Sequence, residues 1–165
     1  MGALMTFRIA TEIGPRLKTD RPRRPRRPRE LRARLEDADH LRLIRALPCL
    51  ISGHTPAGQA AHIRYANAQF GKAITGIGVK PDDKWTVPLC AWEHTESSGA
   101  QHRFGEETWW IERGIDPLQV ASNLYACSLA LRAMRTDEGT IIQALTHIIQ
   151  NARAARPSVE SEDPR

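Results

Sequence analysis

The sequence has no apolar run that approaches the ~20 residues needed to cross a bilayer as a helix. Near its start, Arg8 and Glu12 stand where a secretory signal peptide would have its apolar stretch. Cysteine is scarce, and Cys49, Cys90 and Cys127 form an odd number that is too small for a disulfide framework. These absences argue against membrane-spanning and disulfide-rich secreted proteins. We therefore expect a cytoplasmic protein in a reducing environment.

The chain is also too short for a large multidomain enzyme. Its 165 residues, of which 41% are hydrophobic, suffice for one domain of ordinary size with disordered ends. The net charge of +5 is unevenly placed, because residues 16–29 hold eight Lys or Arg and one Asp, a net of +7. The rest of the chain is left with −2, so the basicity belongs to an N-terminal segment.

This basic segment has a proline at every third position between residues 21 and 29. Proline blocks helix and strand while the guanidinium groups repel one another, which predicts an extended, disordered arm over residues 1–30. Each arginine that neutralises a phosphate releases counterions, so such an arm suits binding to nucleic acid without sequence preference. The candidate nucleic-acid-binding residues are Arg21, Arg23, Arg24, Arg26, Arg27 and Arg29. The alternatives are a solubilising extension and a translation start at Met5.

Beyond the arm, the patterns predict both helices and strands. Apolar residues recur at mostly helical spacing between Leu31 and Leu47, which indicates one or two amphipathic helices that end at Pro48. Two short apolar runs are typical of strands and flank a glycine-rich loop, a pattern that favours a long-looped hairpin. These runs cover residues 60–63 and 85–89, and further helices are expected over residues 106–113, 117–134 and from 138 onward.

These elements predict an α+β fold in which a small hairpin is surrounded by helices. We expect one hairpin domain with a leading helix over residues 31–118 and C-terminal helices over residues 119–154. A disordered polar tail is expected over residues 155–165. The apolar face of the last helix predicts packing on the domain or a homodimer contact through the C-terminal helices.

Side chains that bind metals or move protons are concentrated around the predicted hairpin. They are Cys49, His54, His62, Asp82, Asp83, Cys90, Glu93, His94 and His102. An imidazole can accept a proton from water, carboxylates and further imidazoles can hold a divalent cation, and cysteines can hold a structural metal. Such a set suits hydrolysis of a phosphodiester. Taken singly, each residue has a plainer interpretation, such as a hydrogen-bonded core histidine or a turn aspartate.

The order of several stretches carries a family resemblance. They are residues 47–53, 60–66 and 76–90, followed by His94, by residues 101–102 and by residues 109–117. In this order and spacing the chain resembles the HNH or ββα-metal endonucleases, in particular the phage-derived branch related to the recombination-enhancement nuclease Ref. The resemblance covers roughly residues 47–118 and implies a small ββα-metal hairpin domain that hydrolyses DNA with a divalent cation, Mg²⁺ or Mn²⁺.

The resemblance also implies roles for individual residues. His62 falls on the general base of the family, and Asp83 falls on the position filled by Asp or Asn that orients the site. His94 and His102 fall on the histidines of the following helix that hold the catalytic metal, with Asp82 as a helper. A neutral imidazole, with a pKa near ~6.5, suits the proposed proton transfer at neutral pH.

The family commonly holds a structural zinc ion between two Cys-containing motifs that flank the hairpin. Here Cys49, Cys90 and Glu93 form the remnant of that site, and Ser52 stands where a second cysteine is usual. Serine is a poor zinc ligand and glutamate supplies only an oxygen, so we expect no tight structural zinc.

Two alternatives to an active endonuclease remain. One is a catalytically decayed relative that keeps the fold and only binds nucleic acid, which the altered zinc positions favour. The other is a helical protein-interaction module built on residues 116–153, which explains the isoleucine-rich last helix but leaves the histidines without a role.

Overall fold

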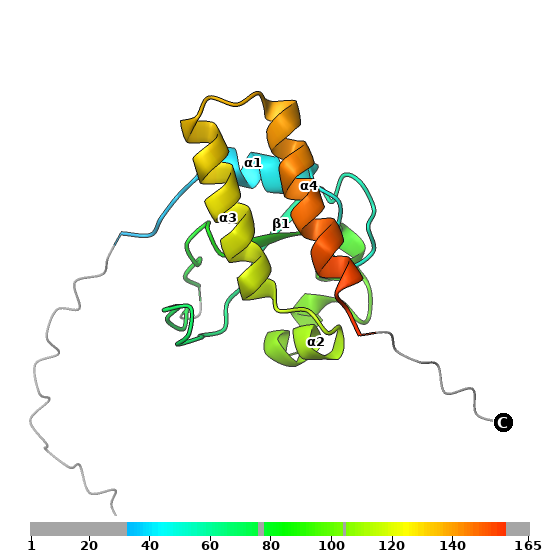
Figure 1. The fold of residues 1–165 in the computed structure, drawn as a ribbon. Helices are drawn as coiled ribbons and strands as arrows, with labels where there is room; N and C mark the ends of the chain where they lie inside the picture. Colours follow the sequence, from blue (N-terminus) through cyan, green and yellow to red (C-terminus); the bar gives the residue numbers. More distant parts are fainter. Residues whose placement is uncertain (1–32, 76–77, 104, 158–165) are drawn as a thin grey trace, which may run out of the picture. The chain divides into compact units, whose positions relative to one another are not determined.

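The computed structural model describes residues 33–75, 78–103 and 105–157 (Figure 1). The predicted basic arm and the end of the predicted tail lie outside these residues. The described chain has a mixed α+β fold, in which a two-stranded antiparallel hairpin is followed by helices. In the described part of the chain, no helix combines the length and the apolar character that a bilayer crossing requires.

The first helix, α1, spans Ala38–Ala46 and begins where Asp37 caps it by accepting a hydrogen bond from the backbone N–H of His40. Its buried residues are His40, Leu43 and Ile44, whereas Leu41 is only half-buried. The apolar spacing between Leu31 and Leu47 predicted an inner face of apolar residues, and a histidine lies there as well.

The hairpin is formed by β1, Gln59–His62, and β2, Thr86–Leu89, as the two apolar runs predicted. The strands are antiparallel, with Gln59 opposite Leu89 and His62 opposite Thr86. All four β2 residues are buried, because α1 and α3 both pack against this strand. The long loop between the strands returns the chain to the end of β1, where His62 lies.

After the hairpin the chain makes two short turns before its regular helices. A π-helical turn covers Trp92–Glu96 and a 3₁₀ turn covers Gln101–Arg103. The resemblance had implied a regular helix at this point. The helix α2, Glu106–Glu112, begins only after these turns. His94 and His102 therefore lie on two short turns and not on one regular helix.

The two longest helices, α3 (Pro117–Ala133) and α4 (Glu138–Ala154), lie side by side in Figure 1 and confirm the predicted C-terminal helices. Each begins at an aspartate whose side chain accepts hydrogen bonds from the first turn, Asp116 for α3 and Asp137 for α4. Their inner faces join the hairpin and α1 in one core. Its largest fully buried side chains include Trp109, Trp110, Leu118, Leu124, Leu145 and Ile149.

Candidate active site

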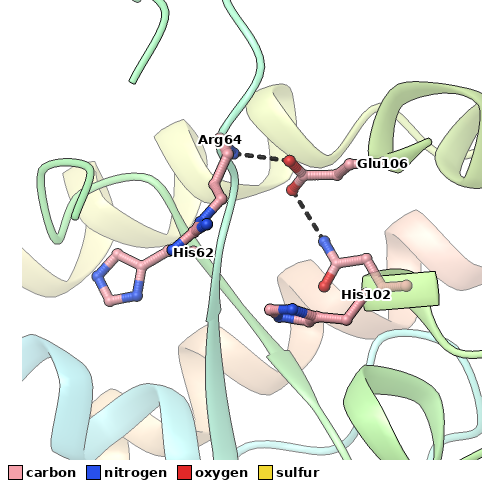
Figure 2. A pocket seen from close by; sticks show the side chains of 5 residues that line it. His62, Arg64, His102 and Glu106 are labelled. Atoms are coloured by element: carbon pink, nitrogen blue, oxygen red, sulfur yellow. Dashed lines mark hydrogen bonds between the residues drawn. The ribbon is translucent and has the colours of Figure 1, made fainter. Parts of the chain in front are cut away.

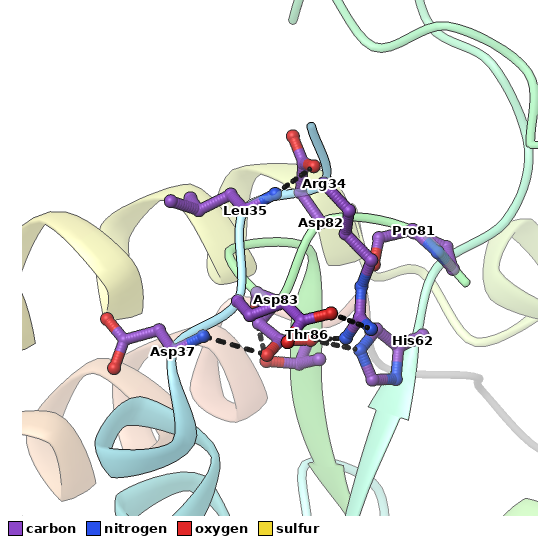
Figure 3. Close-up of polar contacts among 9 residues, drawn as sticks. Arg34, Leu35, Asp37, His62, Pro81, Asp82, Asp83 and Thr86 are labelled. Carbon is purple, nitrogen blue, oxygen red and sulfur yellow. Dashed lines mark hydrogen bonds and ion pairs between the residues drawn. The ribbon is translucent and has the colours of Figure 1, made fainter. Parts of the chain in front are cut away.

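His62 and Asp83, the predicted base and its orienting carboxylate, are in direct contact (Figure 3). His62 lies at the end of β1, and its Nε2 atom is 2.9 Å from Oδ1 of Asp83. Asp83 precedes β2 and is only 2% exposed. Its carboxylate also pairs with the guanidinium of Arg34 and accepts the backbone N–H of Asp37 at 2.9 Å. The hairpin therefore brings together two side chains that are 21 residues apart in the sequence.

The charges of this pair are set by their surroundings. Burial raises the pKa of Asp83, but hydrogen bonds from Asp37, His62 and Arg34 outweigh it and lower the pKa below its ordinary value. For His62 the balance is different: burial lowers its pKa below the ordinary value, although the hydrogen bond and the charge of Asp83 act to raise it. At neutral pH the site therefore holds an Asp83 anion beside a neutral imidazole.

These protonation states also define the tautomer of His62. An ionised carboxylate can only accept, so the Nε2 atom of His62 carries the hydrogen that Asp83 receives. The lone pair then lies on Nδ1, the other ring nitrogen. A neutral imidazole oriented in this way by a carboxylate can take a proton from a water molecule.

His94 and His102, the predicted metal ligands, also come together. The Nε2 atoms of the two rings are 2.9 Å apart, although His94 lies on the π-helical turn and His102 on the 3₁₀ turn. The Nδ1–H of His94 donates to Oε1 of Gln59 at 2.5 Å, which leaves the lone pair of His94 on Nε2. Burial, followed by the charges of His102 and His62, lowers the pKa of His94 to about 4. His94 is thus a neutral imidazole with its lone pair directed at its partner.

This geometry fits a shared divalent cation. Two nitrogens bound at roughly 2.1 Å to one ion, at a right angle, would lie about 3 Å apart, close to the separation of the two Nε2 atoms. Without an ion, the Nε2–H of His102 donates to His94. Binding an ion would require the other tautomer of His102, in which Nδ1 carries the hydrogen and the lone pair lies on Nε2.

The remaining predicted metal residue is placed differently. Oδ1 of Asp82 accepts the backbone N–H of Leu35 at 2.8 Å. Within residues 33–75, 78–103 and 105–157, no three His, Cys, Asp or Glu side chains are grouped as a metal site. The described chain therefore offers two protein ligands, and any other ligands would come from water or substrate.

A pocket of about 180 Å³ joins the two halves of the site (Figure 2). It is lined by His62, Arg64, Gln101, His102 and Glu106. Glu106 accepts the backbone N–H of Arg64 and the side-chain amide of Gln101, so it ties the end of β1 to the 3₁₀ turn. Burial raises the pKa of Glu106, and hydrogen bonds from the backbone of Arg64 and Tyr65 oppose that rise.

Four residues of this site were not identified from the sequence: Gln59, Arg64, Gln101 and Glu106. Arg64 had a usable signal, because it follows His62 by two positions and so leaves the strand on the same side. The roles of Gln59 and Glu106 depend on contacts across 35 and 42 residues, which no local pattern reveals.

Of the residues around the predicted zinc remnant, Cys49, Ser52 and Cys90 lie close together. The backbone N–H of Cys90 points at Sγ of Cys49 at 3.3 Å, and Oγ of Ser52 lies 3.7 Å from Sγ of Cys90. Arg156, which follows α4, brings a positive charge close to these residues. Its guanidinium donates to the carbonyls of Leu50 and Ile51. Burial lowers the pKa of Arg156, while Cys49 and Glu93 act to raise it.

Comparison with protein-family models, with curated proteins and with solved structures finds no match to this chain. Any functional conclusion therefore depends on the residues and on the geometry of the site itself.

Proposed function

We propose that the protein is a metal-dependent endonuclease that hydrolyses phosphodiester bonds in DNA. One observation carries the proposal: a neutral histidine oriented by a carboxylate, His62, lines the same pocket as His102, whose Nε2 atom lies 2.9 Å from Nε2 of His94. A base and a cation site beside one pocket are the two components that phosphodiester hydrolysis needs.

Each residue of the pocket has a separate role in this reaction. His62 takes a proton from the attacking water at Nδ1, and Asp83 stabilises the imidazolium that forms. Arg64 lines the pocket and supplies a positive charge for a non-bridging oxygen of the phosphate. When bound between His94 and His102, a divalent cation supplies positive charge to the transition state.

The proposed fold of the site is a ββα-metal hairpin in modified form. The hairpin β1–β2 and the two histidines that follow it support this assignment. The helical part is reduced to a π-helical turn and a 3₁₀ turn, a type of irregularity that often occurs at functional sites.

The ligand chemistry also bears on the choice of metal. Imidazole is a better ligand for transition metals than for Mg²⁺, which prefers oxygen. With two imidazoles and no third protein ligand among the described residues, we expect Mn²⁺ to support more activity than Mg²⁺ at equal concentration.

The test is a plasmid-nicking assay with Mn²⁺, Mg²⁺ or EDTA. Wild-type protein should nick DNA with Mn²⁺ and lose the activity in EDTA. His62→Ala should reduce the rate by about 10²–10⁴-fold, the contribution typical of a general base, without loss of DNA binding. His147→Ala is the matched control, because it removes an exposed histidine of α4.

A decayed protein that only binds nucleic acid is the second candidate, favoured by the small number of protein metal ligands in the described chain. It predicts DNA binding without nicking under any of these metal conditions. That result would overturn the endonuclease proposal. Equal nicking by wild type and His62→Ala would remove His62 as the base.

A further inference from the structure

The segment before α1, residues 33–37, which we call the strap, runs along residues 81–83 at the entrance to β2 (Figure 3). Arg34 makes two of its contacts through different parts of one guanidinium. Nε donates to the carbonyl of Pro81 at 2.8 Å, and Nη2 pairs with Oδ1 of Asp83. Arg34 therefore binds the Asp83 carboxylate and also the backbone two residues before it.

The backbone of the strap adds three further hydrogen bonds. The N–H of Leu35 donates to Asp82 at 2.8 Å, and the carbonyl of Leu35 accepts the N–H of Asp83 at 2.9 Å. The N–H of Asp37 donates to Oδ2 of Asp83, the oxygen that His62 does not contact. With His62 and Arg34 on one oxygen and Asp37 on the other, the carboxylate cannot rotate without breaking charge-assisted hydrogen bonds.

The strap is itself tied to the helices. Both carboxylate oxygens of Asp37 pair with Arg132 of α3, at 2.9 and 2.5 Å, and one of them caps α1. A continuous set of polar contacts therefore runs from Arg132 through Asp37 and Asp83 to the imidazole of His62. This path connects the C-terminal helices to the site.

We propose that Arg34 is a positioning residue for the reaction, acting through Asp83 to fix the orientation and the tautomer of His62. The inference rests on the proposed function. Arg34 does not line the pocket, so its contribution is to hold Asp83 and not to contact the phosphate. An arginine suits this role because its planar fork presents donors in two directions, whereas a lysine is a single point of charge.

The experiment compares three variants of the full chain. Arg34→Gln removes the charge and most of the fork, and Arg34→Lys keeps the charge alone. Arg42→Gln is the matched control, because Arg42 forms an exposed ion pair with Glu138 away from the site. Each variant is measured for kcat and KM on plasmid DNA with Mn²⁺. The tautomer of His62 is read from its imidazole ¹⁵N resonances, and the fold is checked by circular dichroism.

For Arg34→Gln we expect kcat to fall by about 10–100-fold with KM nearly unchanged, as is typical when the residue that orients a catalytic group is removed. The ¹⁵N resonances of His62 should move from the Nε2–H tautomer toward a mixture. Arg34→Lys should recover part of kcat, and Arg42→Gln should match wild type.

Several results would overturn the inference. A raised KM with unchanged kcat would make Arg34 a phosphate contact. A folded Arg34→Gln with wild-type kcat and an unchanged His62 tautomer would show that the strap has no positioning role. If Arg34→Gln does not fold, the result for Arg34→Lys decides. A wild-type kcat in Arg34→Lys would show that the forked guanidinium is not needed, and this would overturn the inference.

The tautomer measurement needs no catalysis, so it separates the two proposals. If wild-type protein does not nick DNA, the proposed function fails. The positioning role of Arg34 is then tested by the ¹⁵N resonances of His62 alone. An unchanged His62 tautomer in Arg34→Gln would overturn that role as well.

Discussion

His40 should make the stability of the protein fall steeply in mild acid. This histidine lies on α1 with no exposed surface, and its Nδ1 atom is 2.8 Å from Oγ of Ser128. The Ser128 hydroxyl donates to the carbonyl of Tyr125, so the Nδ1–H of His40 is the donor to Ser128. Nε2 is buried and has no hydrogen-bond partner within the described chain. A bare Nε2 is tolerable in the neutral ring, but a second N–H there would be buried without an acceptor.

The magnitude follows from the pKa of this ring. Burial lowers the pKa of His40 to about 4; Arg132 acts in the same direction, while Asp37 and Asp83 oppose it. The folded pKa is lower than the unfolded value of 6.5, so the contribution is complete above pH ~6.5 and is lost as the pH falls toward 4. At 1.36 kcal/mol per pKa unit, the loss is about 1 kcal/mol by pH ~5.5 and on the order of 3 kcal/mol by pH ~4.

The assay is denaturant unfolding of wild type and His40→Gln at several values between about pH 8 and pH 4.5. At high pH the variant should be less stable by about 1–3 kcal/mol, because a buried hydrogen bond is disturbed. The two curves should converge as the pH falls, since only wild type must protonate His40 on unfolding. His147→Gln, at an exposed site, should run parallel to wild type. Parallel curves for His40→Gln would refute the reasoning.

Deletion of residues 1–29 should weaken DNA binding about equally for all sequences and make the slope of log affinity against log salt shallower by ~0.9 for each phosphate that the arm no longer neutralises. An unchanged slope would leave the arm as a solubilising extension, and His62→Ala should keep the full slope. Elemental analysis of the purified protein should give less than one zinc per chain, and Ser52→Cys combined with Glu93→His should raise zinc affinity. One tightly held zinc in the wild type would contradict this prediction. Leu124→Ala, in the centre of the core, should cost about 3–5 kcal/mol in denaturant unfolding, and a loss below ~1 kcal/mol would show that the helices pack loosely there.

Local sequence patterns predicted most of the regular structure. Two short apolar runs that flank a glycine-rich loop indicated the strands that became β1 and β2, and helical spacing indicated α3 and α4. These elements were predictable because each carries apolar residues that enter the core, a property that is visible locally in the sequence.

What periodicity missed depends on partners far away in the chain. A histidine faces the core on α1 because Ser128, 88 residues later, supplies its hydrogen bond. The irregular turns that carry His94 and His102 have no repeating pattern to detect. The contact of His62 with Asp83 was expected only through a family resemblance. The strap that holds Asp83 had no signal, because four of its five hydrogen bonds to residues 81–83 involve backbone atoms.

The polar ties that complete the site also determine when it can form during synthesis. Arg132 is made 95 residues after Asp37, and Arg156 is made 106 residues after Leu50. When the last residue of the hairpin, Leu89, is added, neither arginine has yet been synthesised. At that stage Asp37 of the strap has no Arg132 to pair with, and the carbonyls of Leu50 and Ile51 have no Arg156 to accept from. These two ties can therefore form only after α3 and α4 have been synthesised, so the C-terminal helices complete polar contacts that involve the first residues of the described chain.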